Sequence, residues 1–351
     1  MHRSTKPNVS QSALRSEILE QPDAVARLLD AEREHAWRLG ARIQKLAPPF
    51  VWIAARGTSD NAARYAQYAF GMRCGLPVAL AAPSLTTLYK QSPRVRGALA
   101  IGISQSGTSP DIVANLRAAR RGGAFTIAIV NDTNSPLARA ADEILPLHAG
   151  VEQSVAATKT YTAQLAAVAL LAEAILQKRG PSRELLAIPE SMERALLTEA
   201  RVRETAQIFK LAFHAVALSR GINLSTCFEL SLKLKELALM LVEPYSSADF
   251  EHGPIAMMEP ELRRHALPAI VISPPGILGQ KELLLLTKRL QQKGAPVISI
   301  GTGSIEIPNV TEWLSPLIAA IPCQWLAYYS ALAKGFDPDR PRGIAKITRT
   351  R

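Results

Sequence analysis

Long apolar runs are missing from this sequence of 351 residues. No uninterrupted apolar stretch approaches the roughly 18 residues that a membrane-spanning helix needs. The first residues, Met1 to Ser4, also lack the apolar core of a secretion signal. Cysteine is scarce, and its three residues lie far apart with no C-x-x-C pair for metal or redox work. We therefore expect a cytoplasmic protein whose cysteines are small core residues.

Several catalytic motifs are also missing. The chain has no G-x-G-x-x-G after a first strand, no G-x-x-x-x-G-K-[ST], no H-E-x-x-H and no G-x-S-x-G. These absences disfavour dinucleotide enzymes, P-loop NTPases, zinc peptidases and α/β-hydrolases. The 48% hydrophobic and 20% charged residues are globular proportions. At about 150 residues per domain, the length predicts two domains.

The charge is positive, with 41 Lys and Arg against 30 Asp and Glu, a formal net charge of +11. Such a positive net charge favours binding of either a nucleic acid or a phosphorylated small molecule. The basic residues, for example Arg117, Arg120 and Arg121, are mixed with acidic ones and have few aromatic residues between them. No basic stripe results, so the sequence favours a phosphorylated small ligand and no nucleic-acid partner.

Three segments of the first half recur, in the same order, in the second half. The pairs are V-W-I-A-A-R-G at 51–57 with A-V-A-L-S-R-G at 215–221, A-I-G-I-S-Q-S-G at 100–107 with A-I-V-I-S-P-P-G at 269–276, and G-A-F-T-I-A-I at 123–129 with G-A-P-V-I-S-I at 294–300. Continuous apolar strands separated by helical stretches indicate parallel sheets that are covered on both faces. We predict an α/β protein in which each half is a three-layer α/β/α sandwich with a flavodoxin-like parallel sheet.

The domain boundary is predicted from helix-breaking residues between the two halves, Gly180, Pro181 and Pro189. Before the first strand, apolar residues recur at helical spacing and predict helices that clasp another domain or subunit. A last helix is expected at about 315–334. We predict an N-terminal helical segment at 1–47, a first α/β domain at 48–185, a second at 186–336 and an extended tail at 337–351.

The most informative motif is S-Q-S-G-T-S-P-D at 104–111, between an apolar strand and a helix. Ser109 suits the N-cap and Pro110 the first helical position, so hydroxyls and backbone N–H groups converge at the positive end of the helix dipole. An ordinary capped turn explains these two residues but not the other polar ones. We predict a phosphate site here. In the second copy Pro274 and Pro275 remove two N–H donors, so only the first half should hold the anion.

Two other polar turns of the first half are expected at the same sheet edge. They are G-T-S-D at 57–60 and E-Q-S-V-A-A-T-K at 152–159. Ligands of open α/β sheets bind at the carboxyl ends of the strands, where such turns meet. Each turn taken alone is more typical of a helix cap.

Glu229, Lys233 and Glu236 share one helix face in the second half, at i, i+4 and i+7. This pattern fits a solvated ion-pair stripe equally well as a carboxylate beside an amine that moves a proton between adjacent sugar carbons. His252 is predicted to lie in a polar loop at 246–254 that ends in Gly-Pro, where an exposed imidazole suits acid and base catalysis. A plain surface histidine is the alternative. His214 lies in an apolar strand, and His2, His35, His148 and His265 have no suggestive surroundings.

Six ordered motifs, spread over nearly the whole chain, resemble those of double sugar-isomerase (SIS) domain proteins. Among these proteins, the motifs are similar in particular to those in the isomerase part of glutamine:fructose-6-phosphate aminotransferase, also called glucosamine-6-phosphate synthase. The motifs are G-T-S at 57–59, S-Q-S-G at 104–107, V-A-A-T-K at 155–159, L-K-L-K-E at 232–236, E-H-G-P at 251–254 and P-R-G-I-A-K at 341–346.

The resemblance implies a set of functional residues. Glu236 would be the base that moves a proton between C1 and C2, assisted by Lys233, and Lys346 of the tail would lie over the sugar. His252 would open the sugar ring in the site of the neighbouring subunit, which implies a homodimer. No metal or redox cofactor is implied. The implied substrate-binding residues are Thr58, Ser59, Ser104, Gln105, Ser106, Ser109, Glu152, Val155 and Ala345.

Departures from the synthase concern the reaction. No glutaminase domain precedes the first SIS unit here, so glutamine is not expected as the ammonia source. Ala157 stands where the synthase has serine, and Thr108 where it has glutamate, so contacts with the sugar hydroxyls are expected to differ. S-Q-S-G-x-S-P-D together with E-x-x-V-A-A-T-K looks most like the stand-alone, second type of glucosamine-6-phosphate deaminase.

The expected reaction is conversion of glucosamine 6-phosphate to fructose 6-phosphate and ammonia. Within the same enzyme class, another aminosugar-phosphate deaminase, a fructosamine-6-phosphate deglycase and a simple phosphosugar isomerase remain open. A sugar-phosphate-binding regulator without turnover is the alternative from another class.

Overall fold

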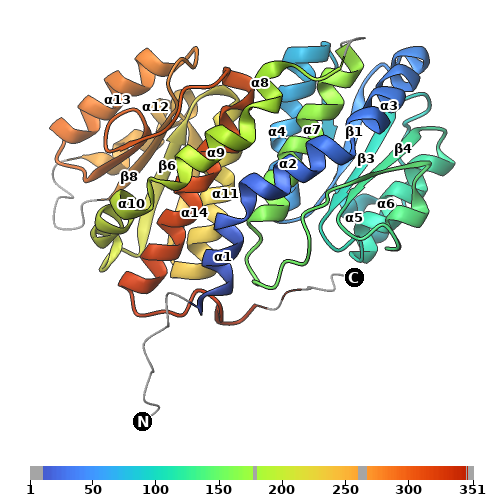
Figure 1. Ribbon diagram of the computed structural model, residues 1–351. Helices are drawn as coiled ribbons and strands as arrows, with labels where there is room; N and C mark the ends of the chain where they lie inside the picture. The colour runs from blue at the N-terminus through green and yellow to red at the C-terminus, as the bar shows by residue number, and fades with distance from the viewer. Residues whose placement is uncertain (1–10, 177–179, 260–266, 345, 347–351) are drawn as a thin grey trace. The chain divides into compact units, whose positions relative to one another are not determined.

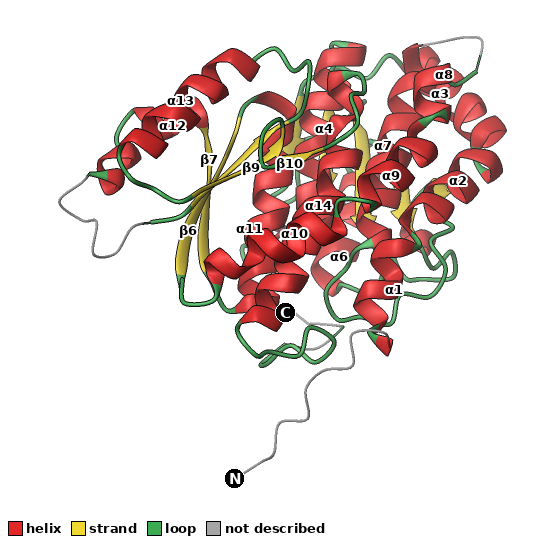
Figure 2. Ribbon diagram, turned by 60° about the vertical axis from the view of Figure 1, so that its left-hand side comes forward, coloured by secondary structure: helices red, strands yellow, loops and turns green. Residues whose placement is uncertain are grey.

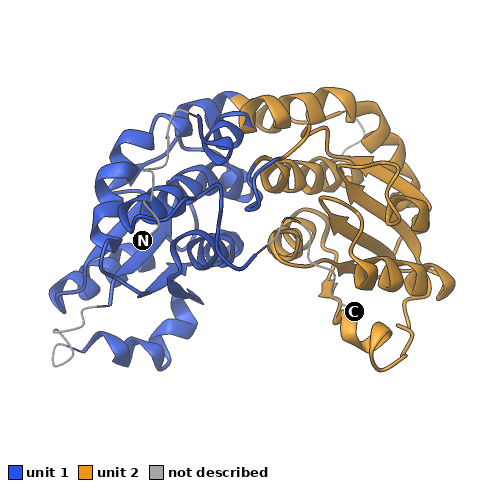
Figure 3. Ribbon diagram, turned by 90° about the horizontal axis from the view of Figure 1, so that it is seen from below, with its two compact units in different colours: residues 1–20, 153–158, 190–344 blue, residues 21–152, 159–189, 345–351 orange. Residues whose placement is uncertain are grey.

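The computed structural model describes residues 11–176, 180–259, 267–344 and 346. The chain divides into two compact units, coloured separately in Figure 3. Unit 1 comprises residues 1–20, 153–158 and 190–344, and unit 2 comprises residues 21–152, 159–189 and 345–351. Both units are therefore built from separate stretches of the chain. Among the helices of the described ranges, none is long and apolar enough to cross a bilayer.

Unit 2 is built on a five-stranded parallel sheet with the order β2-β1-β3-β4-β5. Every residue of β1 and β3 is buried. Helices cover both faces of the sheet, so apolar and polar residues do not alternate along these strands. The strands are β1 (Val51–Ala54), β2 (Val78–Leu80), β3 (Leu99–Ser104), β4 (Phe125–Val130) and β5 (Glu143–Pro146).

Helices cover this sheet on both faces (Figure 1). On one face, Ile112 and Leu116 of α6 pack against Trp52 and Ala100 of the strands. On the other, α4 contacts the strands, and α7 packs against α2, α3 and α4. Almost all of α7 is consequently buried. The helices of this unit are α2 (Gln21–Ala31), α3 (Arg33–Leu46), α4 (Thr58–Cys74), α5 (Pro83–Thr87), α6 (Pro110–Arg121), α7 (Lys159–Leu176) and α8 (Arg183–Leu186), with the 3-10 turn η2 (Ala138–Ala140).

Unit 1 repeats the design with a sheet of order β10-β9-β8-β6-β7, again parallel throughout. Counted in order of appearance, both sheets have the strand order 2-1-3-4-5, which is that of flavodoxin-like folds. The predicted repeat is therefore confirmed, because each pair of matching segments forms strands at the same place in the two sheets. The strands are β6 (His214–Ser219), β7 (Leu241–Ser246), β8 (Ala269–Ser273), β9 (Val297–Gly301) and β10 (Ile305–Glu306).

The sheet of unit 1 lies between α12 and α13 on one side and α11 on the other (Figure 2). Phe250 of α12 and Leu286 of α13 share a core with Val216 and Val271 of the strands. Helix α14 packs against α11, α10 and α1. The helices are α1 (Ala13–Leu19), α10 (Glu199–Thr205), α11 (Leu224–Ala238), α12 (Ser247–Glu251), α13 (Gln280–Gln292) and α14 (Ser315–Ala333), with the turns η3 (Ala206–Phe209), η4 (Gly221–Asn223), η5 (Pro254–Met258) and η7 (Glu312–Leu314); α9 (Ile188–Leu196) runs across the unit boundary.

The predicted terminal helices are also found. The N-terminal segment, from residue 11 onward, forms α1, α2 and α3, and α14 matches the helix expected at 315–334. The N-terminal helices are divided between the units, because α1 packs in unit 1 whereas α2 and α3 pack on α7 in unit 2. Stretches of the two units alternate along the chain. The domain boundary that we predicted near residue 186 stays a prediction.

Candidate functional site

The loop that joins β3 to α6 has the hydroxyl-rich geometry of an anion site. The Ser104 hydroxyl accepts a hydrogen bond from the Gly107 amide at 3.1 Å, and the Ser106 hydroxyl accepts one from the Thr108 amide at 3.3 Å. Ser109 is the N-cap of α6, but its side chain makes no capping hydrogen bond. Its hydroxyl, together with the positive end of the helix dipole, is thus placed to interact with an anion.

Gly107 determines the shape of this loop. Its φ of +62° lies in the left-handed region, and a Cβ at this position would lie 2.1 Å from the Ser135 hydroxyl oxygen. The Gly107 carbonyl in turn accepts a hydrogen bond from the Leu137 amide at 3.0 Å. Only glycine fits here without moving the next loop.

The turn after β1 lies beside this loop, because β1 and β3 are hydrogen-bonded neighbours. Arg56 Nε, before that turn, lies 2.7 Å from Oδ2 of the buried Asp111 in α6. Thr58 is the first residue of α4 and therefore lies at the carboxyl edge, as predicted. Ser59 points elsewhere, since its hydroxyl accepts a hydrogen bond from Gln164 Nε2 of α7 at 2.9 Å.

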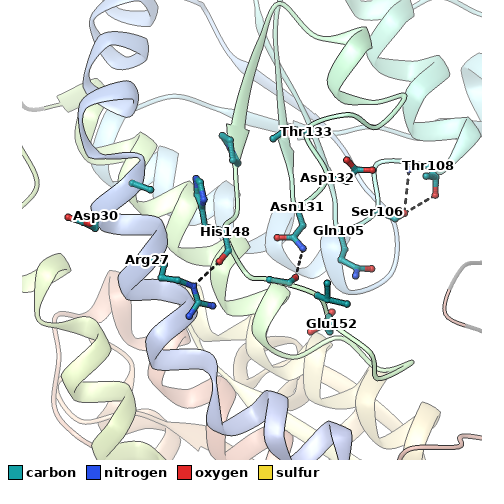
Figure 4. Close-up of a pocket in the computed structure, with 14 residues that line it drawn as sticks. Arg27, Asp30, Gln105, Ser106, Thr108, Asn131, Asp132, Thr133, His148 and Glu152 are labelled. Atoms are coloured by element: carbon teal, nitrogen blue, oxygen red, sulfur yellow. Dashed lines mark hydrogen bonds between the residues drawn. The ribbon is translucent and has the colours of Figure 1, made fainter.

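A cavity of about 1050 Å³ opens beside the loop, at the carboxyl ends of β4 and β5. This volume lies just above the range of about 300–1,000 Å³ that is usual for small-molecule sites. Figure 4 shows polar side chains from four segments around it. Of the predicted substrate-binding residues, the cavity brings together Gln105, Ser106 and Glu152. Its other lining residues are Arg27, Asp30, Ala31, Thr108, Asn131, Asp132, Thr133, Pro146, His148, Gly150 and Val151.

Glu152 links two predicted parts of the site. Its buried carboxylate accepts hydrogen bonds from the Thr160 amide at 3.2 Å and from the Thr160 hydroxyl at 2.5 Å. Lys346 Nζ, in the C-terminal tail, lies 3.6 Å from Glu152 Oε2. The structure thus brings the predicted tail lysine to the predicted acidic residue. Val155 is half-buried in the part of the segment that belongs to unit 1, and Ala345 lies outside the described residues.

Two histidines for which the sequence suggested no role contact the same carboxylate, Glu32, and one of them, His148, lines this cavity. His148 Nε2 lies 2.6 Å from Glu32 Oε1, and His35 Nδ1 lies 2.7 Å from Glu32 Oε2. Burial raises the pKa of the Glu32 carboxyl, but the hydrogen bonds with His35 and His148 outweigh it and lower the pKa overall. The hydrogen bond with Glu32 raises the pKa of His35. In the sequence, the one indication that His148 belongs to the site is its position just after β5, at the carboxyl edge of the sheet.

The acid–base residues expected in the second half lie on α11 in unit 1. Lys233 Nζ lies 2.7 Å from Glu236 Oε2 and 3.5 Å from Glu229 Oε1. The side chains of Lys233 and Glu229 are only 2% exposed, whereas that of Glu236 is 24% exposed. The alternative of a solvated ion-pair stripe is therefore wrong. A buried ammonium instead lies beside a carboxylate that is partly exposed to solvent.

His252 has an exposed side chain and forms the C-cap of α12. The polar stretch around it is not the loop that we predicted, because residues 247–251 form α12 and a 3-10 turn begins at Pro254. Ser246 at the N-cap and Asp249 in the first turn favour this short helix. Within the described part of the chain, the imidazole has no hydrogen bond or ion pair.

The corresponding turn of the second sheet offers fewer donors. The Gly276 amide donates to Gln280 Oε1 at 3.2 Å, and the Leu278 amide donates to Glu312 Oε2 at 3.3 Å. Side-chain oxygens thus accept from two amides of this turn, as those of Ser104 and Ser106 do in the first copy. Pro274 and Pro275, which have no N–H, remain the difference between the two turns, and phosphate binding by the first half alone stays a prediction.

These features define a class of protein, an α/β protein with two parallel sheets of flavodoxin-like strand order. The comparisons agree, since the SIS domain model matches residues 51–174. A glutamine:fructose-6-phosphate aminotransferase of Bradyrhizobium diazoefficiens is 34% identical over 94% of this chain and 57% of its own length. The chain thus spans little more than half the length of that relative.

Two solved structures match over almost their whole length. One, described as a candidate phosphosugar isomerase from Silicibacter pomeroyi, is 32% identical with a TM-score of 0.83 and covers 93% of this chain and 100% of its own. The other is the C-terminal domain of glucosamine-fructose-6-phosphate aminotransferase from Francisella tularensis, with 26% identity, a TM-score of 0.83, and 94% and 98% coverage. The chain belongs to the SIS-domain family and has the fold of its phosphosugar isomerases.

Proposed function

We propose that the protein is a phosphosugar aldose–ketose isomerase that also releases ammonia, converting glucosamine 6-phosphate and water to fructose 6-phosphate and ammonia. The observation that carries this proposal is the pairing of Glu236, a carboxylate accessible to solvent, with the buried ammonium of Lys233 at 2.7 Å. A carboxylate held in this way can take a proton from one carbon and return it to the next.

The loop at 104–109 is proposed to hold the phosphate of the substrate. The hydroxyls of Ser104, Ser106 and Ser109, the Gln105 amide and the amides at the start of α6 together supply donors for an oxyanion. Thr58, at the neighbouring turn, is proposed to add a further hydroxyl. Because the phosphate is the same in every candidate substrate, this loop supports the substrate class and leaves the sugar open.

The proton transfer is proposed to proceed from the open-chain aldehyde. Glu236 takes the proton from C2 while water gives a proton to the C1 oxygen, and an enolamine results, with a hydroxyl on C1 and the amino group on C2. Glu236 then returns its proton to C1, and the amino group gives a proton back to water, which leaves an imine at C2. Water adds to this imine, and the C2–N bond then breaks to give ammonia and the ketose. The ammonium of Lys233, 2.7 Å from Glu236 Oε2, is proposed to hold the Glu236 carboxylate in place before it takes the proton.

His252 is proposed to open the sugar ring by moving a proton between the ring oxygen and the C1 hydroxyl. Its exposed imidazole, without a partner in the described residues, is suited to a ligand that comes from outside its own unit. We propose a homodimer in which His252 serves the site of the neighbouring subunit. Lys346 is proposed to lie over the sugar, with Glu152 as its ion-pair partner.

A panel of phosphorylated sugars tests this proposal. Glucosamine 6-phosphate, galactosamine 6-phosphate, a fructosamine 6-phosphate, glucose 6-phosphate and fructose 6-phosphate are incubated with the protein, and ammonia, free amine and ketose are measured. Ammonia release that is fastest from glucosamine 6-phosphate supports the deaminase. Faster amine release from the fructosamine supports the deglycase, and interconversion of the sugars without ammonia supports a simple isomerase. Binding of the sugars without any turnover supports a regulator instead.

A further inference from the structure

We propose that α1 is a positioning element, in which Glu17 fixes the start of the segment 153–158 and Asp339 fixes the helix to the segment that leads into the C-terminal tail. The expected effect of α1 on turnover rests on the proposed function, whereas its effect on the positions of the two segments is independent of that function. Glu17, Ser154 and Asp339 all belong to unit 1 and lie in three separate stretches of the chain.

The Glu17 side chain binds both the backbone and one side chain of the segment 153–158. The buried carboxylate, which is 4% exposed, accepts hydrogen bonds from the amides of Gln153 and Ser154 and from the Ser154 hydroxyl. Three donors on two consecutive residues fix the direction of the chain at that point. Hydrogen bonds to an ionised carboxylate are about twice as strong as those between neutral groups.

Asp339 holds the other end of the same helix. Its Oδ1 accepts hydrogen bonds from the Leu14 amide at 2.8 Å and from the Ser12 hydroxyl at 3.1 Å. Ser12 is the N-cap of α1, and its hydroxyl also accepts a hydrogen bond from the Arg15 amide at 3.2 Å. The carboxylate therefore binds where the first amides of the helix have no partner within it. Asp339 comes shortly before Lys346 in the sequence.

A third contact holds α1 against the rest of unit 1. Arg15 donates to both carboxylate oxygens of Glu199 in α10, at 2.8 and 2.9 Å, and the Tyr329 hydroxyl donates to the same carboxylate at 2.5 Å. Paired donors of this kind fix orientation as well as distance. Because α1 is held in this way, Glu17 can act as a fixed support for the segment that it binds.

Both segments lead to residues that are expected in the substrate site. Gln153 and Ser154 lie between Glu152 and Val155, and the segment with Asp339 leads to Lys346. Within unit 2, Lys346 in turn contacts Glu152. Misplacing reacting groups by about 1 Å can cost about 100-fold in rate. A short helix that ties down both segments is therefore expected to affect turnover although it contacts no substrate.

Hydrogen–deuterium exchange tests the positioning directly and needs no substrate. The full-length Glu17→Gln variant is compared with wild type and with Glu34→Gln, a matched change at a side chain that is 91% exposed. We expect the amides of Gln153 and Ser154 to exchange at least about tenfold faster in Glu17→Gln and unchanged in Glu34→Gln. Asp339→Asn should raise exchange in residues 11–20. Wild-type exchange at 153–154 in Glu17→Gln would overturn the proposal.

Kinetics then separate positioning from general stability. For Glu17→Gln we expect kcat to fall about tenfold or more while KM and the affinity for inorganic phosphate change less than about twofold, because the phosphate loop is untouched. Ser154→Ala removes one donor and should show a smaller effect in the same direction, and the double variant should resemble Glu17→Gln alone. Faster exchange with unchanged kcat would overturn the role in turnover. If no phosphosugar is turned over by wild type, the proposed function fails, but the exchange experiment still decides the positioning.

Discussion

Lys233 Nζ lies between two carboxylates of its own helix, 2.7 Å from Glu236 and 3.5 Å from Glu229. The pair with Glu229 is almost completely buried, whereas Glu236 is partly open to solvent. The same ammonium therefore has two roles in our interpretation. It neutralises a charge inside unit 1, and it supports the proposed base.

Glu236→Gln should abolish turnover without abolishing binding. An amide of the same shape cannot accept the C2 proton, and loss of a general base costs typically about 100- to 10,000-fold in rate. We expect kcat for ammonia release from glucosamine 6-phosphate to fall within that range while the calorimetric affinity for the sugar phosphate changes only about twofold. Glu34→Gln serves as the control and should behave as wild type. Normal turnover by Glu236→Gln would remove the basis for the mechanism.

Lys233→Met should destabilise the protein, because it leaves the Glu229 charge buried without this ammonium. Breaking one side of a buried pair costs about 3–5 kcal/mol. Changing both residues, as in Glu229→Gln with Lys233→Met, should recover much of this stability while leaving turnover low. Urea unfolding followed by circular dichroism measures the first effect, and ammonia release measures the second. Full stability of Lys233→Met alone would contradict the assigned role of the pair.

Much of the fold was predictable from local patterns. Apolar runs gave the strands, and the recurrence of A-I-G-I-S-Q-S-G as A-I-V-I-S-P-P-G placed β3 and β8 at the same position in two sheets of equal order. The loop at 104–109 was predictable because an N-cap serine followed by proline marks the start of a helix. These features depend on residues that are close together in the sequence.

The contacts that support the site were not predictable in this way. Glu32 and His148 are 116 residues apart, and Glu17 and Ser154 are 137 residues apart. Such pairs form only when helices from distant parts of the chain pack together, and no local pattern encodes this. The burial of Lys233 likewise follows from the packing of α14 and β7 against α11. The spacing of charges on one helix could not distinguish a buried face from a solvated one.

The thiols should be unreactive in the folded protein. Burial raises the pKa of the Cys74 thiol to about 11 and raises the pKa of both Cys227 and Cys323 further. Because the thiolate is the reactive form, Ellman's reagent at pH 8 should modify Cys74 slowly and the other two more slowly still. All three should react at once after unfolding in guanidinium. A fast reaction in the native protein, retained in Cys74→Ser, would contradict the burial of the other two.

Gly107→Ala should weaken phosphate binding more than its backbone strain alone explains. A left-handed conformation costs a non-glycine residue about 1–2 kcal/mol, and here the new Cβ would also lie 2.1 Å from the Ser135 hydroxyl oxygen. Gly97→Ala is the matched control, because Gly97 also has a positive φ but has nothing within 4 Å of a Cβ. We expect both variants to lower the melting temperature, but only Gly107→Ala to reduce the affinity for inorganic phosphate, by about tenfold or more. Equal affinities in the two variants would mean that the loop shape does not matter for the anion.

The Glu32 cluster should make stability depend on pH in a defined direction. The pKa of His35 is raised above its usual value of about 6.5, so the stabilisation from the charged imidazole is complete below that pH and is lost as the pH rises through the raised pKa. The pKa of Glu32 is lowered, so its contribution is lost only under more acidic conditions. The difference in melting temperature between wild type and His35→Gln should therefore be larger at pH 6 than at pH 9. His214→Gln, at an exposed position on β6, should show no such dependence, and a difference for His35→Gln that grows with pH would contradict the assignment.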